Sequence, residues 1–367
     1  MAASPVIVAA DSAGLASLGE YLFFDTNLSA HRTQACASCH DPAKAFTDSR
    51  NSGSGGAVSL GDDGESLGDR NAPTITYAAL IPEFGTDADG EYAGGVFYDG
   101  RATNLLQQAG QPFTRPGEMA MPAEAAVVAR VREEPLYVGL FEKYFGDSIF
   151  DDTDAAFLAI RQSLVAYEST AAFASFDSKY DRSLRGEYQL TADEELGRQL
   201  FYSQLFNCHR CHLLDTREYQ PGEAFSNHRY HNIGVPVNLQ VRRVNGLGAS
   251  RRDLGLLENP AVDDPAEAGK FKVPTLRNVA VTGPYMHNGV FKDLKTVVLF
   301  YNKFTLSNTE SQTNPETGES WGEPEVPETV DLDLLRQGQP ISSMQLSAIV
   351  AFLEALTDKR YEGLLRQ

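Results

Sequence analysis

Two stretches with the same pattern, Cys36-Ala37-Ser38-Cys39-His40 and Cys208-His209-Arg210-Cys211-His212, decide how this chain is organised. They contain all four cysteines of the 367-residue sequence, so no cysteine remains for another use. Cys-x-x-Cys-His is the attachment signature of a c-type haem: the two thiols bond to the porphyrin vinyl groups, and the histidine that follows lies under the iron. The sequence therefore predicts two covalent haems, each with one proximal histidine, His40 and His212.

A redox-active thiol pair, a zinc site and a disulfide are the competing interpretations of each cysteine pair. A thioredoxin-like pair needs a βαβ context and no adjacent histidine, and a zinc site would need both pairs to converge. Each pair here is followed by its own histidine, which favours haem. Because haem is attached covalently outside the cytoplasm, the predicted location is the periplasm.

Composition restricts the classes of partner. The formal net charge is −19, which argues against nucleic-acid binding because that function needs a basic face. No stretch approaches the ~18 consecutive apolar residues of a membrane-spanning helix. The first residues, Met1 to Ala10, lack the basic segment of a signal peptide, so we expect them to begin a mature chain with an added methionine.

The sequence before each motif indicates a duplicated haem domain. Leu18-Gly19-x-x-Leu22-Phe23 precedes the first motif, and Leu196-Gly197-x-x-Leu200-Phe201 precedes the second. We predict a peroxide-reactive haem domain over residues 1–175, a connecting segment over 176–189, and a second haem domain over 190–367. Both domains should resemble cytochrome c.

Helical periodicity dominates the rest of the chain. Apolar residues at 3.6-residue spacing predict helices over 123–145, 153–170, 293–302 and 344–357. Thr191 and Glu194 form a capping box that should begin the helix before the second motif. Residues 48–75 and 305–332 are polar and rich in turn-forming residues, so they should be long loops. The expected fold is mainly α with long irregular loops.

The ligand on the far side of each iron decides the chemistry, because an open iron can bind peroxide and a closed one only transfers electrons. The loop 48–75 contains no histidine, and the next polar candidates are Gln108 and Glu118. A carboxylate above an open haem can move the peroxide proton, although such residues are more often merely exposed. Tyr301 ends an apolar helical stripe, a position more typical of a core residue.

Longer runs of sequence carry a resemblance to a known family. The chain resembles the bacterial di-haem cytochrome c peroxidase family, and within it the MauG group, from about residue 15 to its end. The matching runs are residues 36–48, 68–74, 107–112, 118–122, 176–181 and 272–289.

The resemblance implies a role for particular residues. His40 would be the proximal ligand of a five-coordinate, high-spin haem, and Glu118 and Gln108 would line its distal pocket. His212 and Tyr301 would be the two axial ligands of the second haem, where ordinary peroxidases of the family have methionine in place of the tyrosine. Asn71 and the backbone carbonyls of Thr282 and Pro284 would bind Ca²⁺, which prefers such oxygen ligands.

The resemblance also implies an activity. Hydrogen peroxide would react at the first haem, two oxidising equivalents would be shared by both irons through Tyr98, and a tryptophan of a periplasmic partner protein would be oxidised at a distance. For MauG, that partner is the precursor of methylamine dehydrogenase, and the product is its tryptophan tryptophylquinone. Related proteins instead modify a tryptophan of a copper-binding partner.

Two positions depart from the MauG pattern, and two other functions stay open. Tyr98 stands where MauG has a tryptophan between the haems, and Phe206 stands where it has a surface tryptophan at the partner contact. The first alternative is a cytochrome c peroxidase that takes electrons from a small cytochrome. The second is an electron carrier without enzymatic activity, in which both irons would be closed.

Overall fold

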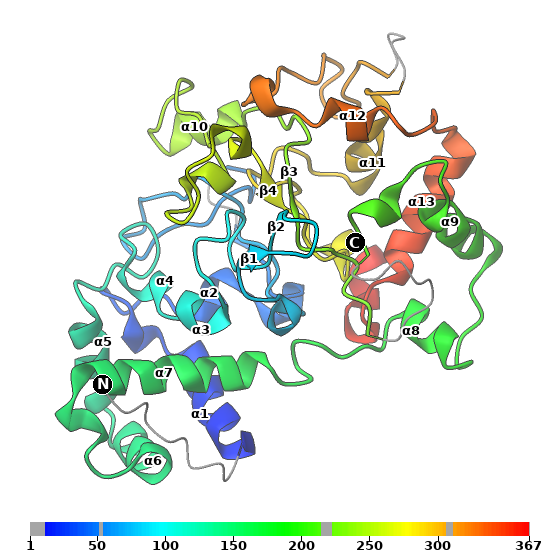
Figure 1. Cartoon of the computed structure of the whole chain (residues 1–367). Helices are drawn as coiled ribbons and strands as arrows, with labels where there is room; N and C mark the ends of the chain where they lie inside the picture. The colour runs from blue at the N-terminus through cyan, green and yellow to red at the C-terminus, as the bar shows by residue number, and fades with distance from the viewer. Residues whose placement is uncertain (1–11, 51–53, 214–221, 306–310, 367) are drawn as a thin grey trace.

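The computed structural model describes residues 12–50, 54–213, 222–305 and 311–366, and it is largely helical (Figure 1). The first ten residues, Met1 to Ala10, lie outside this range. The helices are α1 (Ser12–Phe24), α2 (Cys36–Cys39), α3 (Leu105–Gln108), α4 (Gln111–Thr114), α5 (Glu124–Arg132), α6 (Pro135–Phe145), α7 (Thr153–Glu168), α8 (Lys179–Leu184), α9 (Ala192–Tyr202), α10 (Leu239–Val244), α11 (Leu294–Asn302), α12 (Leu332–Leu335) and α13 (Ser343–Ala355). Among the described residues, none of these helices has the length and apolar character to span a bilayer.

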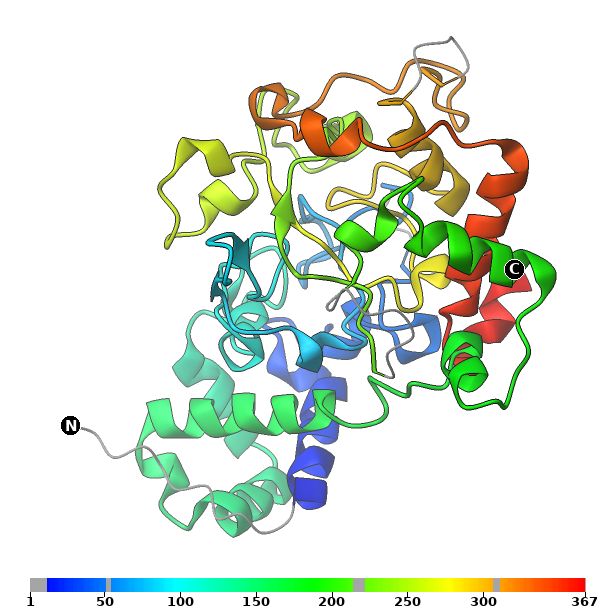
Figure 2. The ribbon, with the colours of Figure 1, turned by 45° about the vertical axis from the view of Figure 1, so that its right-hand side comes forward.

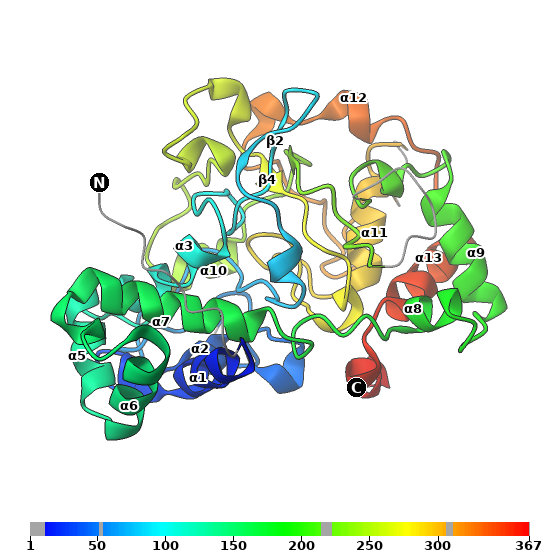
Figure 3. The same cartoon turned by 60° about the horizontal axis from the view of Figure 1, so that its bottom comes forward.

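Two pairs of packed helices form the two main hydrophobic cores. Helices α1 and α7 pack at one end of the molecule, and α9 and α13 pack at the other (Figure 3). At each crossing, a glycine allows the backbones to touch. A Cβ added to Gly19 would overlap the carbonyl of Ser163, and one added to Gly197 would overlap the carbonyl of Ala348. Figure 2 shows α1 (blue) running across α7 (green) at the first of these contacts. The repeated Leu-Gly-x-x-Leu-Phe sequence therefore encodes one helix-crossing geometry twice.

Most of the predicted helices are confirmed, and one is wrong. Helices α7, α11 and α13 match the predicted segments, and Thr191 and Glu194 form the expected capping box of α9. The single helix predicted over 123–145 is instead two helices, α5 and α6. The break comes at Pro135, which has no N–H to donate and is accommodated as the first residue of a new helix.

Short strands join the two halves of the chain. Strand β1 (Gly85–Thr86) pairs antiparallel with β2 (Tyr92–Ala93), and β3 (Tyr230–His231) pairs antiparallel with β4 (Phe271–Lys272). A bridge between Ala93 and Arg229 connects the two strand pairs. The Tyr230 hydroxyl also donates to the carbonyl of Gly94 at 2.6 Å. The halves are thus hydrogen-bonded to each other through their backbones.

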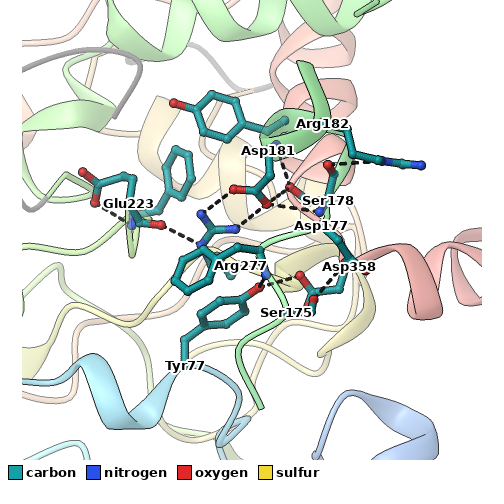
Figure 4. A network of polar contacts seen from close by, with 12 residues as sticks. Tyr77, Ser175, Asp177, Ser178, Asp181, Arg182, Glu223, Arg277 and Asp358 are labelled. Carbon is teal, nitrogen blue, oxygen red and sulfur yellow. Dashed lines mark hydrogen bonds and ion pairs between the residues drawn. The ribbon is translucent and has the colours of Figure 1, made fainter. Parts of the chain in front are cut away.

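A buried polar network fixes the predicted connecting segment, residues 176–189, which contains α8 (Figure 4). Arg277 is fully buried and donates two hydrogen bonds to the Asp181 carboxylate, at 2.8 and 3.0 Å. Its guanidinium lies 4.8 Å from the ring centre of Tyr77, whose hydroxyl donates to Asp358 at 2.5 Å. One network of hydrogen bonds and charges therefore joins Tyr77 of the N-terminal half, Asp181 of the connecting segment, and Arg277 and Asp358 of the C-terminal half.

Candidate functional site

The first cysteine pair is held on a single helical turn. Cys36 and Cys39 are the ends of α2, and the backbone N–H of His40 donates to the Cys36 carbonyl at 2.9 Å. The His40 Nδ1 lies 3.1 Å from the carbonyl of Phe46. A carbonyl can only accept, so Nδ1 carries the hydrogen and Nε2 keeps the lone pair that a metal ligand needs. Burial lowers the pKa of His40 and keeps the ring neutral.

The second cysteine pair repeats this arrangement. The N–H of His212 donates to the Cys208 carbonyl at 3.0 Å, and its Nδ1 lies 3.2 Å from the carbonyl of Phe225. Burial lowers the pKa of His212 to about 4. Both predicted proximal histidines are therefore neutral, with Nε2 free to bind iron, which is the arrangement that a haem requires.

The two phenylalanines whose carbonyls contact the histidines, Phe46 and Phe225, lie in the same local structure, which occurs once in each half of the chain. Phe46 and Phe225 are both buried and both have left-handed backbone conformations, with φ of 56° and 54°. The residue before each phenylalanine accepts a hydrogen bond from a threonine hydroxyl at 2.6 Å: Thr74 donates to Ala45, and Thr275 donates to Ala224. These contacts extend the internal repeat well beyond the two cysteine motifs.

The second motif faces a cavity of about 330 Å³, which Tyr301 also lines. Tyr301 comes from α11, whereas the cysteines and His212 come from the turn after α9, so the tyrosine and histidine reach the cavity from separate elements. The tyrosine is 38% exposed because it opens onto this space. Desolvation by the cavity wall raises the pKa of Tyr301, so its free phenol stays protonated at neutral pH. Although Tyr301 ends the apolar face of α11, its side chain is not buried in the hydrophobic core.

Other predicted site residues line the same cavity. Tyr98, Phe206, Asn71, Thr282 and Pro284 all contribute to its wall. Asn71 is held by its N–H, which donates to the His287 carbonyl at 2.7 Å, and by its side-chain amide N–H, which donates to Ala57 at 3.0 Å. Its side-chain oxygen is the atom available to a cation. Burial also raises the pKa of Tyr98, with Arg70 opposing it.

Glu118 belongs to the surroundings of the first motif. Its charge raises the pKa of both Cys36 and Cys39, after the larger effect of burial. Burial also raises the pKa of Glu118 itself, against the attraction of Arg115, whose Nε lies 3.2 Å from the carboxylate. The Glu118 carboxyl group therefore keeps its proton to a higher pH than a fully exposed carboxyl group does.

Gln108 is placed by a different element from Glu118. It is the last residue of α3, and its backbone N–H donates to Asn104 at 3.1 Å. Helix α4 joins the two positions, because Met119 donates to the carbonyl of Pro112 at 3.2 Å. The described contacts of Gln108 do not include Glu118, so their meeting in one pocket stays a prediction.

Sequence reasoning missed the residues that hold these groups in place. Phe46 and Phe225, with the threonines bonded beside them, could have been found by aligning Ala-Phe and Pro-Thr pairs after the two motifs. The buried Asp62, whose backbone N–H donates to the Glu118 carbonyl at 2.8 Å, carries no comparable signal because it lies in a loop with many aspartates and glycines.

Comparison with known proteins identifies the class. A sequence model of the family Di-haem cytochrome c peroxidase matches residues 13–189. The chain belongs to this family and is a haem-dependent oxidoreductase that acts with peroxide. It is 54% identical to the methylamine utilization protein MauG of Paracoccus denitrificans, over 96% of this chain and 91% of that protein.

More distant relatives include peroxidases. The cytochrome-c peroxidase IdrP1 of Denitromonas iodatirespirans is 31% identical, over 81% of this chain and 76% of that protein. The crystal structure of the di-haem peroxidase BthA from Burkholderia thailandensis superimposes with a TM-score of 0.84 at 30% identity, covering 96% of this chain and 87% of that one. The fold is therefore that of the di-haem peroxidases.

Proposed function

We propose that this chain is a MauG-like enzyme that uses hydrogen peroxide to oxidise tryptophan residues of a partner protein. The observation that carries the proposal is Tyr301, which lines one cavity with Cys208, Cys211 and His212. Oxygen ligation by tyrosine distinguishes this arrangement from the methionine expected in an ordinary peroxidase of the family. The 54% identity to the MauG of Paracoccus denitrificans, against 31% to the peroxidase IdrP1, supports the same choice.

Two haem c groups fit the residues present. The first would be held by Cys36, Cys39 and His40 within residues 1–175, and the second by Cys208, Cys211, His212 and Tyr301 within residues 190–367. When bound, the haems supply the redox chemistry, accepting two oxidising equivalents from peroxide. The bonds from each histidine Nδ1 to a backbone carbonyl keep the hydrogen on Nδ1, fix the orientation of the ring and strengthen Nε2 as an iron ligand.

Glu118 would handle the proton at the first haem. The chemistry that this haem would supply takes a proton from one oxygen of peroxide and needs a proton on the oxygen that leaves as water. A carboxyl group whose pKa is raised by burial holds a proton more readily than an exposed one, so it can take the proton and return it. Gln108 would orient the bound oxygen atoms by donating a hydrogen bond from its amide.

The partner would be the precursor of methylamine dehydrogenase, with tryptophan tryptophylquinone as the product, in the periplasm. Tyr98 would carry charge between the haems, because a phenol is oxidised far more readily than an aliphatic side chain. Phe206 lacks such a group, so the partner contact of this chain must work without a tryptophan at that position. Asn71, Thr282 and Pro284 would hold Ca²⁺ in the wall of the cavity.

Electron paramagnetic resonance of the ferric protein tests the proposal, before and after one equivalent of peroxide without a reductant. We expect one high-spin and one low-spin haem at rest, and loss of both signals together after peroxide. Two low-spin haems that ignore peroxide until one is reduced would identify a cytochrome c peroxidase instead. Two closed haems that bind neither peroxide nor cyanide would identify an electron carrier.

The identity of the partner needs a separate measurement. The enzyme and peroxide are mixed with methylamine dehydrogenase precursor, and the visible absorption of the quinone is followed. We expect quinone to form with this precursor and not with precursor alone. If the resonance experiment succeeds and no quinone forms, the haem chemistry stands and the partner is a different tryptophan-containing protein.

A further inference from the structure

A short segment lies between the first haem attachment site and the turn that carries Glu118. Residues 60–62, called the strap here, contact both. The carbonyl of Leu60 accepts hydrogen bonds from the side chain of Gln34 at 2.6 Å and from Arg50 at 3.3 Å. Arg50 also donates to the sulfur of Cys39 at 3.1 Å. One end of the strap is thus tied to residues around the first cysteine pair.

The side chain of Asp62 fixes the other end of the strap to the segment before Cys36. Its carboxylate is completely buried. One oxygen accepts from the backbone N–H of His31 at 2.6 Å and lies 2.9 Å from its Nδ1. The other accepts from the Thr33 hydroxyl at 2.6 Å and its N–H at 3.3 Å. Burial tends to raise the pKa of Asp62, but the hydrogen bonds from Thr33, Ser29 and His31 outweigh it and hold the pKa well below its usual value.

The backbone of the same residue holds Glu118. The Asp62 N–H donates to the Glu118 carbonyl at 2.8 Å, and the Glu118 N–H donates to Arg115 at 3.0 Å. A Cβ added to Gly61 would lie 3.0 Å from the Gly117 carbonyl, so the strap and the turn are in close contact beside this bond. Any displacement of Asp62 is therefore passed directly to the backbone of Glu118.

We propose that Asp62 is a positioning residue that sets the place of the Glu118 carboxyl group relative to the first haem. The inference rests on the proposed role of Glu118 and adds the means by which that side chain is located. A buried anion with four hydrogen-bond contacts is a rigid anchor, because moving it would leave charge and donors unsatisfied. The anchor and the bond to Glu118 belong to one residue.

The rate of cyanide association with the ferric first haem should depend on the position of Glu118, and it can be measured without enzyme turnover. Hydrogen cyanide binds iron as the anion, so its proton must pass to a nearby base, which here is the Glu118 carboxylate. Glu118→Gln should slow association by about 100-fold, the usual contribution of a positioned base. Asp62→Asn replaces an accepting oxygen with an NH₂ group that cannot accept from His31. We expect it to slow association by about 10-fold or more, since a displacement near 1 Å can cost about 100-fold.

The double variant separates positioning from a general structural effect. If Asp62 acts through Glu118, Asp62→Asn should have no further effect in a Glu118→Gln background. Asp25→Asn is the matched control, because Asp25 likewise accepts from a backbone N–H, of Asn27 at 2.8 Å, and from a hydroxyl, of Tyr137 at 3.0 Å. It is not bonded to the Glu118 turn and should leave the rate unchanged. Thr33→Val removes the hydroxyl contacts with the Asp62 carboxylate at 2.6 Å and with its carbonyl at 3.0 Å but keeps the bonds from His31. It should give a smaller slowing and serves if Asp62→Asn does not fold.

Three results would overturn the inference. The first is an unchanged rate in Asp62→Asn or, if that variant does not fold, in Thr33→Val. The second is an equal slowing by Asp62→Asn with and without Glu118→Gln, which would make Asp62 a structural residue only. In both cases the proposed role of Glu118 survives. The third is an unchanged rate in Glu118→Gln itself, which would refute the proposed role of Glu118 together with the inference.

Discussion

Gly197→Ala should destabilise the protein through the crossing of α9 and α13. The added Cβ would overlap the carbonyl of Ala348, which is backbone and cannot rotate away, so the two helices must separate. Overpacking of this kind costs about 1–3 kcal/mol, and backbone obstruction places it at the upper end, about 3 kcal/mol. Alanine returns about 1 kcal/mol through its higher helix propensity. The net loss in the free energy of unfolding is therefore about 2 kcal/mol.

Gly139→Ala is the matched control and should have the opposite sign. Gly139 lies inside α6, is exposed, and has nothing within 4 Å of the added Cβ, so only the propensity gain of about 1 kcal/mol remains. Thermal unfolding of the haem-loaded proteins, followed by circular dichroism, compares the two. A unit of roughly 180 residues should lose about 4–8 °C in Tm for a 2 kcal/mol loss. A Gly197→Ala protein as stable as Gly139→Ala would refute the packing argument.

Three further predictions concern the second haem, the buried network and a lone carboxyl group. Tyr301→Phe removes the only ligating atom of that side chain, so the low-spin resonance of the second haem should be lost; an unchanged spectrum would show that another group binds this iron. Arg277→Leu leaves the buried Asp181 carboxylate without its cationic partner and should cost about 3–5 kcal/mol in urea unfolding, whereas adding Asp181→Leu should recover part of the loss. Burial raises the pKa of Glu168 from 4.5 to about 8, so the folded state binds more protons than the unfolded state between these pH values, and the free energy of unfolding should fall as the pH rises through that window. Glu168→Gln should abolish this fall, gaining on the order of a few kcal/mol over the wild type at pH 8.5 relative to pH 5.5; parallel pH profiles for the two proteins would contradict it.

The sequence predicts the parts of this molecule that depend on local chemistry. Cys-x-x-Cys-His fixes both cysteines on one turn with the histidine beside them, and helical periodicity locates α7, α11 and α13. The single helix over 123–145 fails because apolar spacing continues through Pro135, which starts a new helix without disturbing the pattern.

Features that depend on distant contacts could not be read from the chain. The direction of Tyr301 is decided by how α11 packs against α13, and helical periodicity alone assigned the residue to the core. The left-handed backbone of Phe46 is unfavourable for an aromatic residue and persists because the surrounding contacts hold it. The Asp62 side chain is held by hydrogen-bond donors about 30 residues earlier in the chain, and its backbone N–H binds an acceptor more than 50 residues later. Neither contact is visible in the local sequence.

The twofold frame of phenylalanine and threonine has a consequence for how reactivity is divided within one chain. His40 and His212 contact matching backbone carbonyls, at 3.1 and 3.2 Å. The two irons would therefore have histidine ligands of nearly the same donor strength. Under the proposed roles of Glu118 and Tyr301, the difference would then come from the groups opposite the histidines, a carboxyl group at one haem and a phenol at the other. The two haem sites would thus differ in reactivity because of a few side chains, whereas the local structure that holds each histidine is the same. Exchanging those side chains should move the reactive centre from one half of the molecule to the other.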